Sequence, residues 1–324
     1  GPLMGFYTDL FLITGNELFK QAVESTAQWT QREMQSSQGG YYSAQDADSE
    51  GVEGKFYVWK KDDIKQLLTA DEYKLVARYF SLDRAANFEG HWHLHCDAQR
   101  YPEGMNAEQR LLWKSAREKL FNVRKQRVAP GTDDKILTAW NALMIKGMVK
   151  AGVVFGEDSW IDSAERSLKF ILAALWKEGR LLAVHREGVS HLNAYLDDYA
   201  YLIDAVLELL SVRWNKGYLE FAIELADVLI DQFEDKQSGG FFFTSNQHES
   251  LIHRPKPFTD DAIPSGNGVA AKVLGRLGLL LGNTKYLQAA ERTLQAAWSD
   301  MNTYPHAHCT LLQALQENLN PVQT

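Results

Sequence analysis

The chain alternates between two kinds of apolar segment, both with helical spacing. The segments that are apolar on every side are residues 135–149, 199–210, 268–281 and 308–315. The segments with a single apolar stripe are residues 16–34, 160–175, 218–233 and 285–298. A helix that is apolar all round is buried, whereas a helix with one stripe lies at the surface. We therefore predict buried and surface helices in alternation, with a repeat of roughly 60 residues.

A Gly-Gly pair followed by aromatic residues ends two of the surface helices. Residues 39–42 read Gly-Gly-Tyr-Tyr and residues 239–242 read Gly-Gly-Phe-Phe, and an acidic loop follows each. The repeated unit indicates hairpins arranged around a common centre. We predict an all-α toroid of the (α/α)6, six-hairpin glycosidase-like type, with short strands in the connecting loops. An α-solenoid is the alternative, but tetratricopeptide repeats of about 34 residues are shorter than the repeat seen here.

One stretch breaks the helical rhythm. Residues 55–131 combine short strand patterns with a charged helix, and we interpret them as an insertion between hairpins. Gly1-Pro2-Leu3 ahead of Met4 resembles a protease-cleavage scar. We therefore expect one toroid domain over residues 4–324, with residues 55–131 inserted between its hairpins.

Composition narrows the class of protein. The net charge of -8 argues against a general nucleic-acid binder, because no basic field would neutralise phosphates. No apolar run reaches the length of about 18 residues that a membrane-spanning helix needs. The two cysteines, Cys96 and Cys309, do not make a disulfide framework. We predict a cytoplasmic protein without a membrane segment.

Several motifs in order along the chain carry a family resemblance. They are residues 39–51, 53–59, 87–90, 133–141, 196–200, 239–244, 254–256 and 262–267. On these motifs the chain resembles the C-terminal part of the YyaL family of thioredoxin-domain-containing proteins, the spermatogenesis-associated protein 20-like proteins. The resemblance implies a toroid similar to six-hairpin glycosidases and N-acylglucosamine 2-epimerases, coupled in the family to a thioredoxin-like domain.

The chain also departs from this family pattern. It has no Cys-x-x-Cys, so we expect neither the thioredoxin-like domain nor a redox role. The family's first hairpin is absent, so we expect a ring that is incomplete or closed by another chain. Ala142 stands where the family has Gly.

Acidic residues gather where loops lead into the buried helices. In a toroid these loops meet at one end and form a concave pocket, which is the default ligand site. Glycoside hydrolysis needs two carboxylates, one as acid and one as base or nucleophile. The candidate catalytic acids are Asp46, Asp48, Asp198 and Asp261. The alternatives are helix N-capping for the acids at helix starts and a hard-cation site for Asp46 and Asp48.

Histidines offer a second chemistry. His306 and His308 begin the last buried helix, where epimerases of this fold class use histidine as general acid or base. The alternative is a histidine that caps or packs. The run 91–95 holds three histidines, but one strand makes a poor zinc site without a fourth group, so we predict no metal. His185 and His191 flank a turn and are expected at the surface.

Further residues near the same loops are candidates for substrate binding. They are Tyr42, Asp134, Trp140, Asn141, Asp197, Tyr199, Ser265 and Asn267. Ser265 and Asn267 can bond to hydroxyl groups. Asn141 lies in an apolar helix and therefore needs a polar partner. Core packing is the favoured role of Trp140.

The sequence therefore predicts a carbohydrate-active or carbohydrate-binding toroid, either glycoside hydrolase-like or sugar epimerase-like. The expected partner is a small saccharide, and no cofactor or nucleic acid is expected. The alternative is a non-catalytic interaction domain with a vestigial pocket, which would hold a thioredoxin-like domain or a second copy of the chain.

Overall fold

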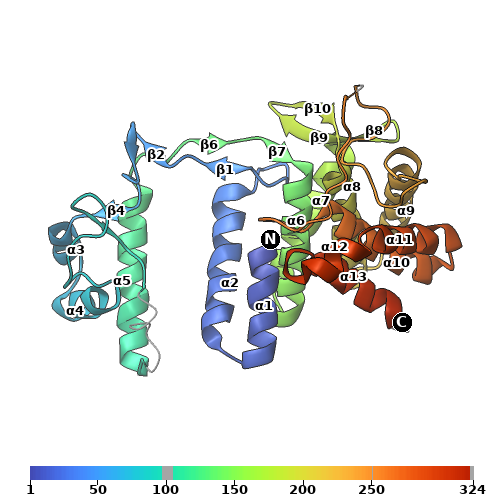
Figure 1. The fold of residues 1–324 in the computed structure, drawn as a ribbon. Helices are drawn as coiled ribbons and strands as arrows, with labels where there is room; N and C mark the ends of the chain where they lie inside the picture. Colours follow the sequence, from blue (N-terminus) through green and yellow to red (C-terminus); the bar gives the residue numbers. More distant parts are fainter. Residues whose placement is uncertain (97–104, 250, 322–324) are drawn as a thin grey trace. The chain divides into compact units, whose positions relative to one another are not determined.

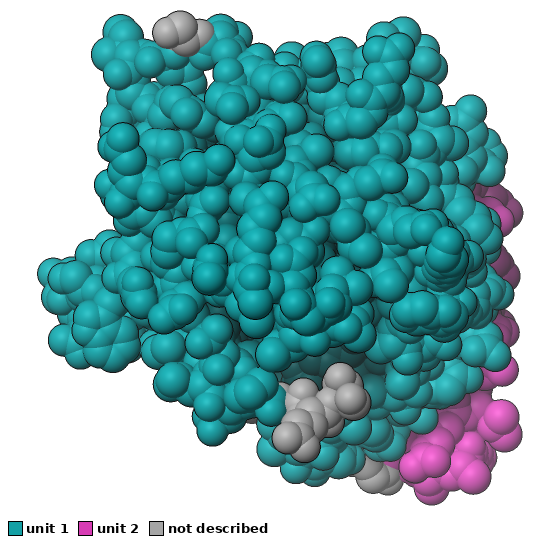
Figure 2. Space-filling view, turned by 90° about the vertical axis from the view of Figure 1, so that its right-hand side faces the viewer, with its two compact units in different colours: residues 1–43, 134–324 teal, residues 44–133 magenta. Residues whose placement is uncertain are grey.

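Figure 1 shows the computed structural model, which describes residues 1–96, 105–249 and 251–321. The chain forms two compact units, coloured separately in Figure 2. The ring unit comprises residues 1–43 and 134–324, and the insert unit comprises residues 44–133. The insert unit contains residues 55–131, the stretch that breaks the helical pattern of the sequence.

The ring unit is built from helical hairpins. They are α1 (Pro2–Thr14) with α2 (Glu17–Trp29), α6 (Thr138–Phe155) with α7 (Asp158–Ala174), α8 (Leu196–Leu210) with α9 (Lys216–Gln232), and α10 (Gly266–Leu281) with α11 (Thr284–Ala296). Two more helices follow, α12 (Trp298–Thr303) and α13 (Cys309–Leu319). The helices α1, α6, α8, α10 and α13 pack against one another in that order, and we call them the inner helices. The outer helices are α2, α7, α9 and α11.

Burial follows the two sequence patterns. Inner helix α8 has buried residues on all its sides, from Leu196 to Leu210. Outer helix α11 buries one stripe, which includes Tyr286, Ala290 and Leu294. The predicted all-α toroid class is confirmed, and the described residues supply five inner and four outer helices. Helix α1 begins at Pro2, inside the expected cleavage scar.

The two Gly-Gly loops meet the outer helices in the same way. A Cβ on Gly39 would lie 2.7 Å from the carbonyl oxygen of Arg166 on α7. A Cβ on Gly239 would lie 2.5 Å from the carbonyl oxygen of Arg292 on α11. Both glycines have a positive φ, which residues with a side chain rarely adopt. The repeat seen in the sequence is therefore a repeated contact in the fold.

The aromatic residue after each Gly-Gly pair is held by an asparagine from an inner helix. Tyr41 donates its N–H to Asn141 Oδ1 at 2.7 Å, and Asn141 Nδ2 donates to the Tyr41 carbonyl at 2.9 Å. Phe241 and Asn267 make the same two bonds at the same distances. The aromatic segments predicted as strands form single bridges rather than ladders.

A small antiparallel sheet connects α7 to α8. Its strands are β7 (Ile136–Leu137), β8 (Trp176–Lys177), β9 (Arg180–Arg186) and β10 (Val189–Asn193). His185 pairs with Ile136 in the register of this sheet and packs edge-on against Phe170. The surface position expected for His185 is wrong, because only 9% of the residue is exposed.

The insert unit has its own core. Its helices are α3 (Lys61–Leu67), α4 (Ala70–Tyr79) and α5 (Ala107–Lys125). Its strands are β1 (Ala44–Gln45) with β6 (Thr132–Asp133), β2 (Asp48–Ser49) with β3 (Val52–Glu53), and β4 (Val58–Trp59) with β5 (Trp92–His93). Trp59, Ile64, Val76 and Leu120 are buried together in its core. In the part of the chain that the structure describes, no helix has the length and apolarity to cross a membrane.

Candidate functional site

Asp198 joins the first turns of two inner helices. Its Oδ2 accepts the N–H of Tyr195 at the start of α8, and its Oδ1 accepts the N–H of Ala139 at the start of α6, both at 2.8 Å. Burial raises the pKa of Asp198 to about 7, although the two backbone N–H groups act to lower it. Both carboxylate oxygens thus accept backbone N–H groups at helix starts, which is the N-capping role given above as the alternative to catalysis.

Asp260 does the same for the next two inner helices. Its Oδ1 accepts the N–H of Ser265 at the start of α10, and its Oδ2 accepts the N–H of Thr310 at the start of α13, both at 2.8 Å. The neighbouring residue Asp261, a predicted catalytic acid, is exposed instead. No signal in the sequence separates the two, because the bond from α13 comes from 50 residues away.

Asp197 lies where α8 meets α10. Its Oδ1 is buried and has no hydrogen-bond partner among the described residues. A Cβ on Gly266, the first residue of α10, would lie 2.1 Å from that oxygen. Burial raises the pKa of Asp197 to about 6. Asp197 as a whole is partly buried, so an acid with a raised pKa and one fully buried oxygen stands at this end of the inner helices.

His308 stands at the N-cap position of α13, the inner helix that packs against α10. Its Nδ1 lies 2.8 Å from the carbonyl oxygen of Tyr304. A carbonyl only accepts, so Nδ1 carries the hydrogen and Nε2 of the neutral ring has a lone pair. Within the described part of the chain, the buried Nε2 has no partner. His306 is exposed nearby in sequence.

Trp140 presents its indole on the first turn of α6. Half of the residue is exposed, which overturns the expected core-packing role. The neighbouring residue Ala139 bonds to Asp198, so Trp140 lies at the same end of the inner helices as the acids. An exposed indole at this end can stack on a sugar ring.

Other predicted binding residues hold the scaffold. Asn141 and Asn267 are buried and bond to the main chain after each Gly-Gly pair. The Oγ of Ser265 accepts the N–H of Gly268 at 3.0 Å as the cap of α10. The phenol oxygen of Tyr199 accepts a backbone N–H at 3.1 Å. These side chains hold the helices and loops in position through their hydrogen bonds, so we assign them to the scaffold.

The remaining candidates lie elsewhere. Asp134 pairs with Arg186 at 3.0 Å, and Tyr42 is half-buried against the core. Asp46 and Asp48 are exposed in the insert unit, where Asp46 Oδ1 accepts the N–H of Asp48 at 3.3 Å. Among the residues described, no three His, Cys, Asp or Glu side chains are placed to hold a metal ion.

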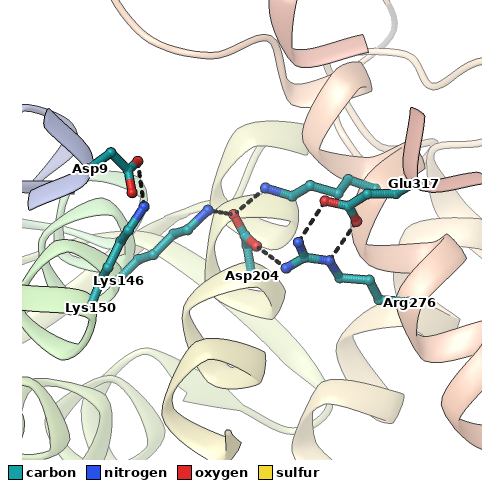
Figure 3. A network of polar contacts seen from close by, with 7 residues as sticks. Asp9, Lys146, Lys150, Asp204, Arg276 and Glu317 are labelled. Atoms are coloured by element: carbon teal, nitrogen blue, oxygen red, sulfur yellow. Dashed lines mark hydrogen bonds and ion pairs between the residues drawn. The ribbon is translucent and has the colours of Figure 1, made fainter. Parts of the chain in front are cut away.

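Sequence reasoning missed a charged network among the inner helices. Asp204 on α8 is 4% exposed and accepts from Lys146 at 2.6 Å and from Lys272 at 3.0 Å (Figure 3). Burial acts to raise the pKa of Asp204, but the two ammonium groups lower it to about 2. Arg276 and Glu317 extend the network to α13. The available signal was a charged residue inside each of these apolar helices.

The fold therefore defines an α/α toroid of helical hairpins with acidic side chains at the start of its inner helices. By sequence, the chain is homologous to the proteins named spermatogenesis-associated protein 20, which confirms the resemblance carried by its motifs. It is 30% identical to the human protein and 31% identical to the rat protein, over 95% of this chain and 44% of each relative. The chain thus spans less than half the length of these curated relatives.

No family model matches the chain. Among solved structures, a D-mannose isomerase is 14% identical with a TM-score of 0.47, over 92% of this chain and 74% of that protein.

Proposed function

We propose that the N-terminal ends of the inner helices form a saccharide site in which Asp197 exchanges a proton with the ligand. The observation that carries the proposal is the Asp197 carboxyl, which has one buried oxygen without a partner among the described residues. Its pKa is raised by burial to about 6. A group that titrates near neutral pH can both donate and accept a proton during turnover.

The surroundings of Asp197 suit a sugar. Trp140 offers an aromatic face on the neighbouring inner helix, and sugar rings pack their apolar faces on such side chains. The exposed His306 precedes α13, so it lies at the same end and can bond to hydroxyl groups.

The available groups favour proton transfer on a reducing sugar over glycoside hydrolysis. Hydrolysis needs a second carboxylate opposite the first. Both oxygens of Asp198 already accept backbone N–H groups. His308 instead supplies an imidazole lone pair, so Asp197 and His308 form the acid–base pair of an epimerase or isomerase.

A proton NMR time course tests this function. Reducing sugars are incubated with the protein in deuterium oxide, and new anomeric signals and loss of the proton beside the carbonyl are followed. Asp197→Asn is expected to lower turnover at least about 100-fold, because it removes the acid. The matched control is Asp261→Asn, which changes an exposed acid at the same end and is expected to keep turnover within about threefold.

Each of three outcomes would change a different part of this proposal. Equal turnover in the wild type and Asp197→Asn, with both folded, would refute the role of Asp197. Release of monosaccharides from a reducing disaccharide, without deuterium beside the carbonyl, would replace epimerisation with hydrolysis. Saturation transfer without turnover would reduce the proposal to a sugar-binding module.

A second candidate function is a non-catalytic interaction domain. It is favoured by exposed apolar side chains on α1, where Phe6 is 55% exposed and Ile13 is 81% exposed. Such a surface fits a thioredoxin-like domain or a second copy of the chain. A ligand that binds only the folded state raises the melting temperature. An unchanged melting temperature across a panel of concentrated sugars would favour this second function.

A further inference from the structure

A cavity of about 680 Å³ lies at the opposite end of the inner helices from Asp197, where the C-terminal ends of α8, α10 and α13 meet. Leucines dominate its walls, among them Leu207, Leu210 and Leu287. Leu279 and Leu280 also line it and are 51% and 52% exposed. The volume is that of a site for a small molecule, and exposed leucines favour an apolar occupant.

A glycine in the middle of α10 keeps this cavity open. Gly275 lines the cavity, and no heavy atom lies within 4 Å of the position that its Cβ would take. Its φ lies outside the positive range that favours glycine, so the backbone does not require one. Glycine also weakens a helix interior. Glycine at position 275 therefore leaves space in the cavity, and the backbone conformation does not require it.

The polar part of the cavity is already neutral. Lys272 and Arg276 line it, but Lys272 bonds to Asp204 at 3.0 Å, and Arg276 bonds to Glu317 at 2.7 and 2.6 Å (Figure 3). An anionic ligand would have to break one of these pairs. Arg276 Nη1 lies 3.9 Å from Asp204 Oδ1, a buried oxygen without a hydrogen-bond partner in the described residues. Asp204 itself does not line the cavity, so Arg276 is the donor that faces it, and an uncharged hydroxyl or carbonyl oxygen can accept from it.

We propose that this cavity binds an uncharged amphiphile. Its apolar body lies among the leucines, and its single polar group lies against Arg276. The site is separate from the proposed saccharide site, because it lies at the other end of the same helices and shares no side chain with it.

Two fluorescent probes test the proposal. N-phenylnaphthylamine is uncharged, and anilinonaphthalene sulfonate has the same rings with an added anionic group. We expect the uncharged probe to bind the wild-type protein at least about tenfold more tightly. Gly275→Leu should fill the cavity without a backbone clash and weaken the uncharged probe by at least about tenfold, with an unchanged or higher melting temperature. The matched control, Gly275→Ala, should bind within about threefold of the wild type.

Three results would overturn the proposal. The first is the absence of fluorescence enhancement by the uncharged probe on the wild-type protein, which would leave the cavity to a segment of a partner protein. The second is equal or tighter binding of the anionic probe. The third is a folded Gly275→Leu variant that binds the uncharged probe as the wild type does. Loss of binding in Gly275→Leu, with binding kept in Gly275→Ala, supports it.

Discussion

At the scale of single residues, two buried asparagines complete the main-chain hydrogen bonding of the Gly-Gly loops. Asn141 and Asn267 each accept the N–H and donate to the carbonyl of one loop residue, which pairs with a neighbouring segment through a single bridge only. Buried backbone groups require such partners. The same residue in the same place on two inner helices indicates that it belongs to the scaffold.

The first prediction concerns these asparagines. Asn267→Ala should lower the free energy of unfolding by about 2–4 kcal/mol, because buried N–H and carbonyl groups of Phe241 lose their partner. Asn141→Ala should show a loss of similar size. The control Asn302→Ala removes an exposed amide and should change stability by less than about 0.5 kcal/mol. Urea denaturation measures all three, and a loss below that of the control would contradict the account.

The second prediction concerns pH. The pKa of Asp197 is raised in the folded state to about 6, above its unfolded value of about 3.9. Ionisation of this group therefore weakens the folded state as the pH rises from about 4 to above 6. Asp197→Asn removes that loss, so its stability relative to the wild type should rise by on the order of 2 kcal/mol between pH 4 and pH 7. A difference that stays constant over this range would show that the carboxyl titrates normally.

Residue type alone does not assign the roles of the aspartates at the helix starts. The sequence indicates that Asp197 and Asp198 stand at a helix start, but their roles depend on Ala139 and Gly266, which reach them through packing. The same holds for Asp260, whose second bond comes from Thr310. Capping and chemistry use the same residue type, so only the fold assigns them.

At the scale of elements, the apolar pattern predicted the helices and their inner or outer position. It missed the strands β9 and β10, since their pairing depends on the turn at Glu187 and Gly188, which the helical pattern does not report. The aromatic segments after the Gly-Gly pairs are not regular strands, because each pairs with a neighbouring segment at one residue only.

The third prediction concerns the Gly-Gly loops. Gly239 has a φ of 75° and faces the Arg292 carbonyl, whereas Gly179 has a φ of 73° and open space around it. Alanine at either position meets the same backbone strain. Gly239→Ala should therefore lower the free energy of unfolding by about 1–3 kcal/mol more than Gly179→Ala does. Equal losses in the two variants would mean that the contact with α11 contributes nothing.

At the scale of the ring unit, ion pairs connect consecutive inner helices. Asp9 on α1 pairs with Lys150 on α6 at 2.6 Å, and Asp204 on α8 pairs with Lys146 on α6 and Lys272 on α10 (Figure 3). The Asp9–Lys150 pair is partly exposed, whereas Asp204 and Lys272 are buried. Buried charges cost desolvation and contribute mainly when all partners are present. The network thus makes the packing of each inner helix depend on its neighbours.

The fourth prediction concerns this network. Asp204→Asn should lower the free energy of unfolding by about 3–5 kcal/mol at pH 7, because Lys272 stays buried without its counter-charge. Adding Lys272→Met should restore part of the loss. The control Glu24→Gln breaks the exposed pair with Lys20 and should change stability by less than about 1 kcal/mol. A double variant less stable than Asp204→Asn alone would contradict this interpretation.

The pH dependence of the same group has the opposite sign to that of Asp197. The folded-state pKa of Asp204 is lowered to about 2, below its unfolded value of about 3.9. Its contribution to stability is therefore present above pH 4 and is lost as the pH falls toward 2.

The central claim is that a saccharide binds at the start of the inner helices, beside Trp140 and Asp197. Saturation-transfer NMR with a panel of reducing sugars tests it most directly, in the wild type, Trp140→Ala and Asp197→Asn. We expect transfer to sugar protons in the wild type and a marked loss in Trp140→Ala, whose melting temperature should change little because the indole is half exposed. Absence of transfer from the wild type to every sugar, or equal transfer from all three proteins, would contradict it.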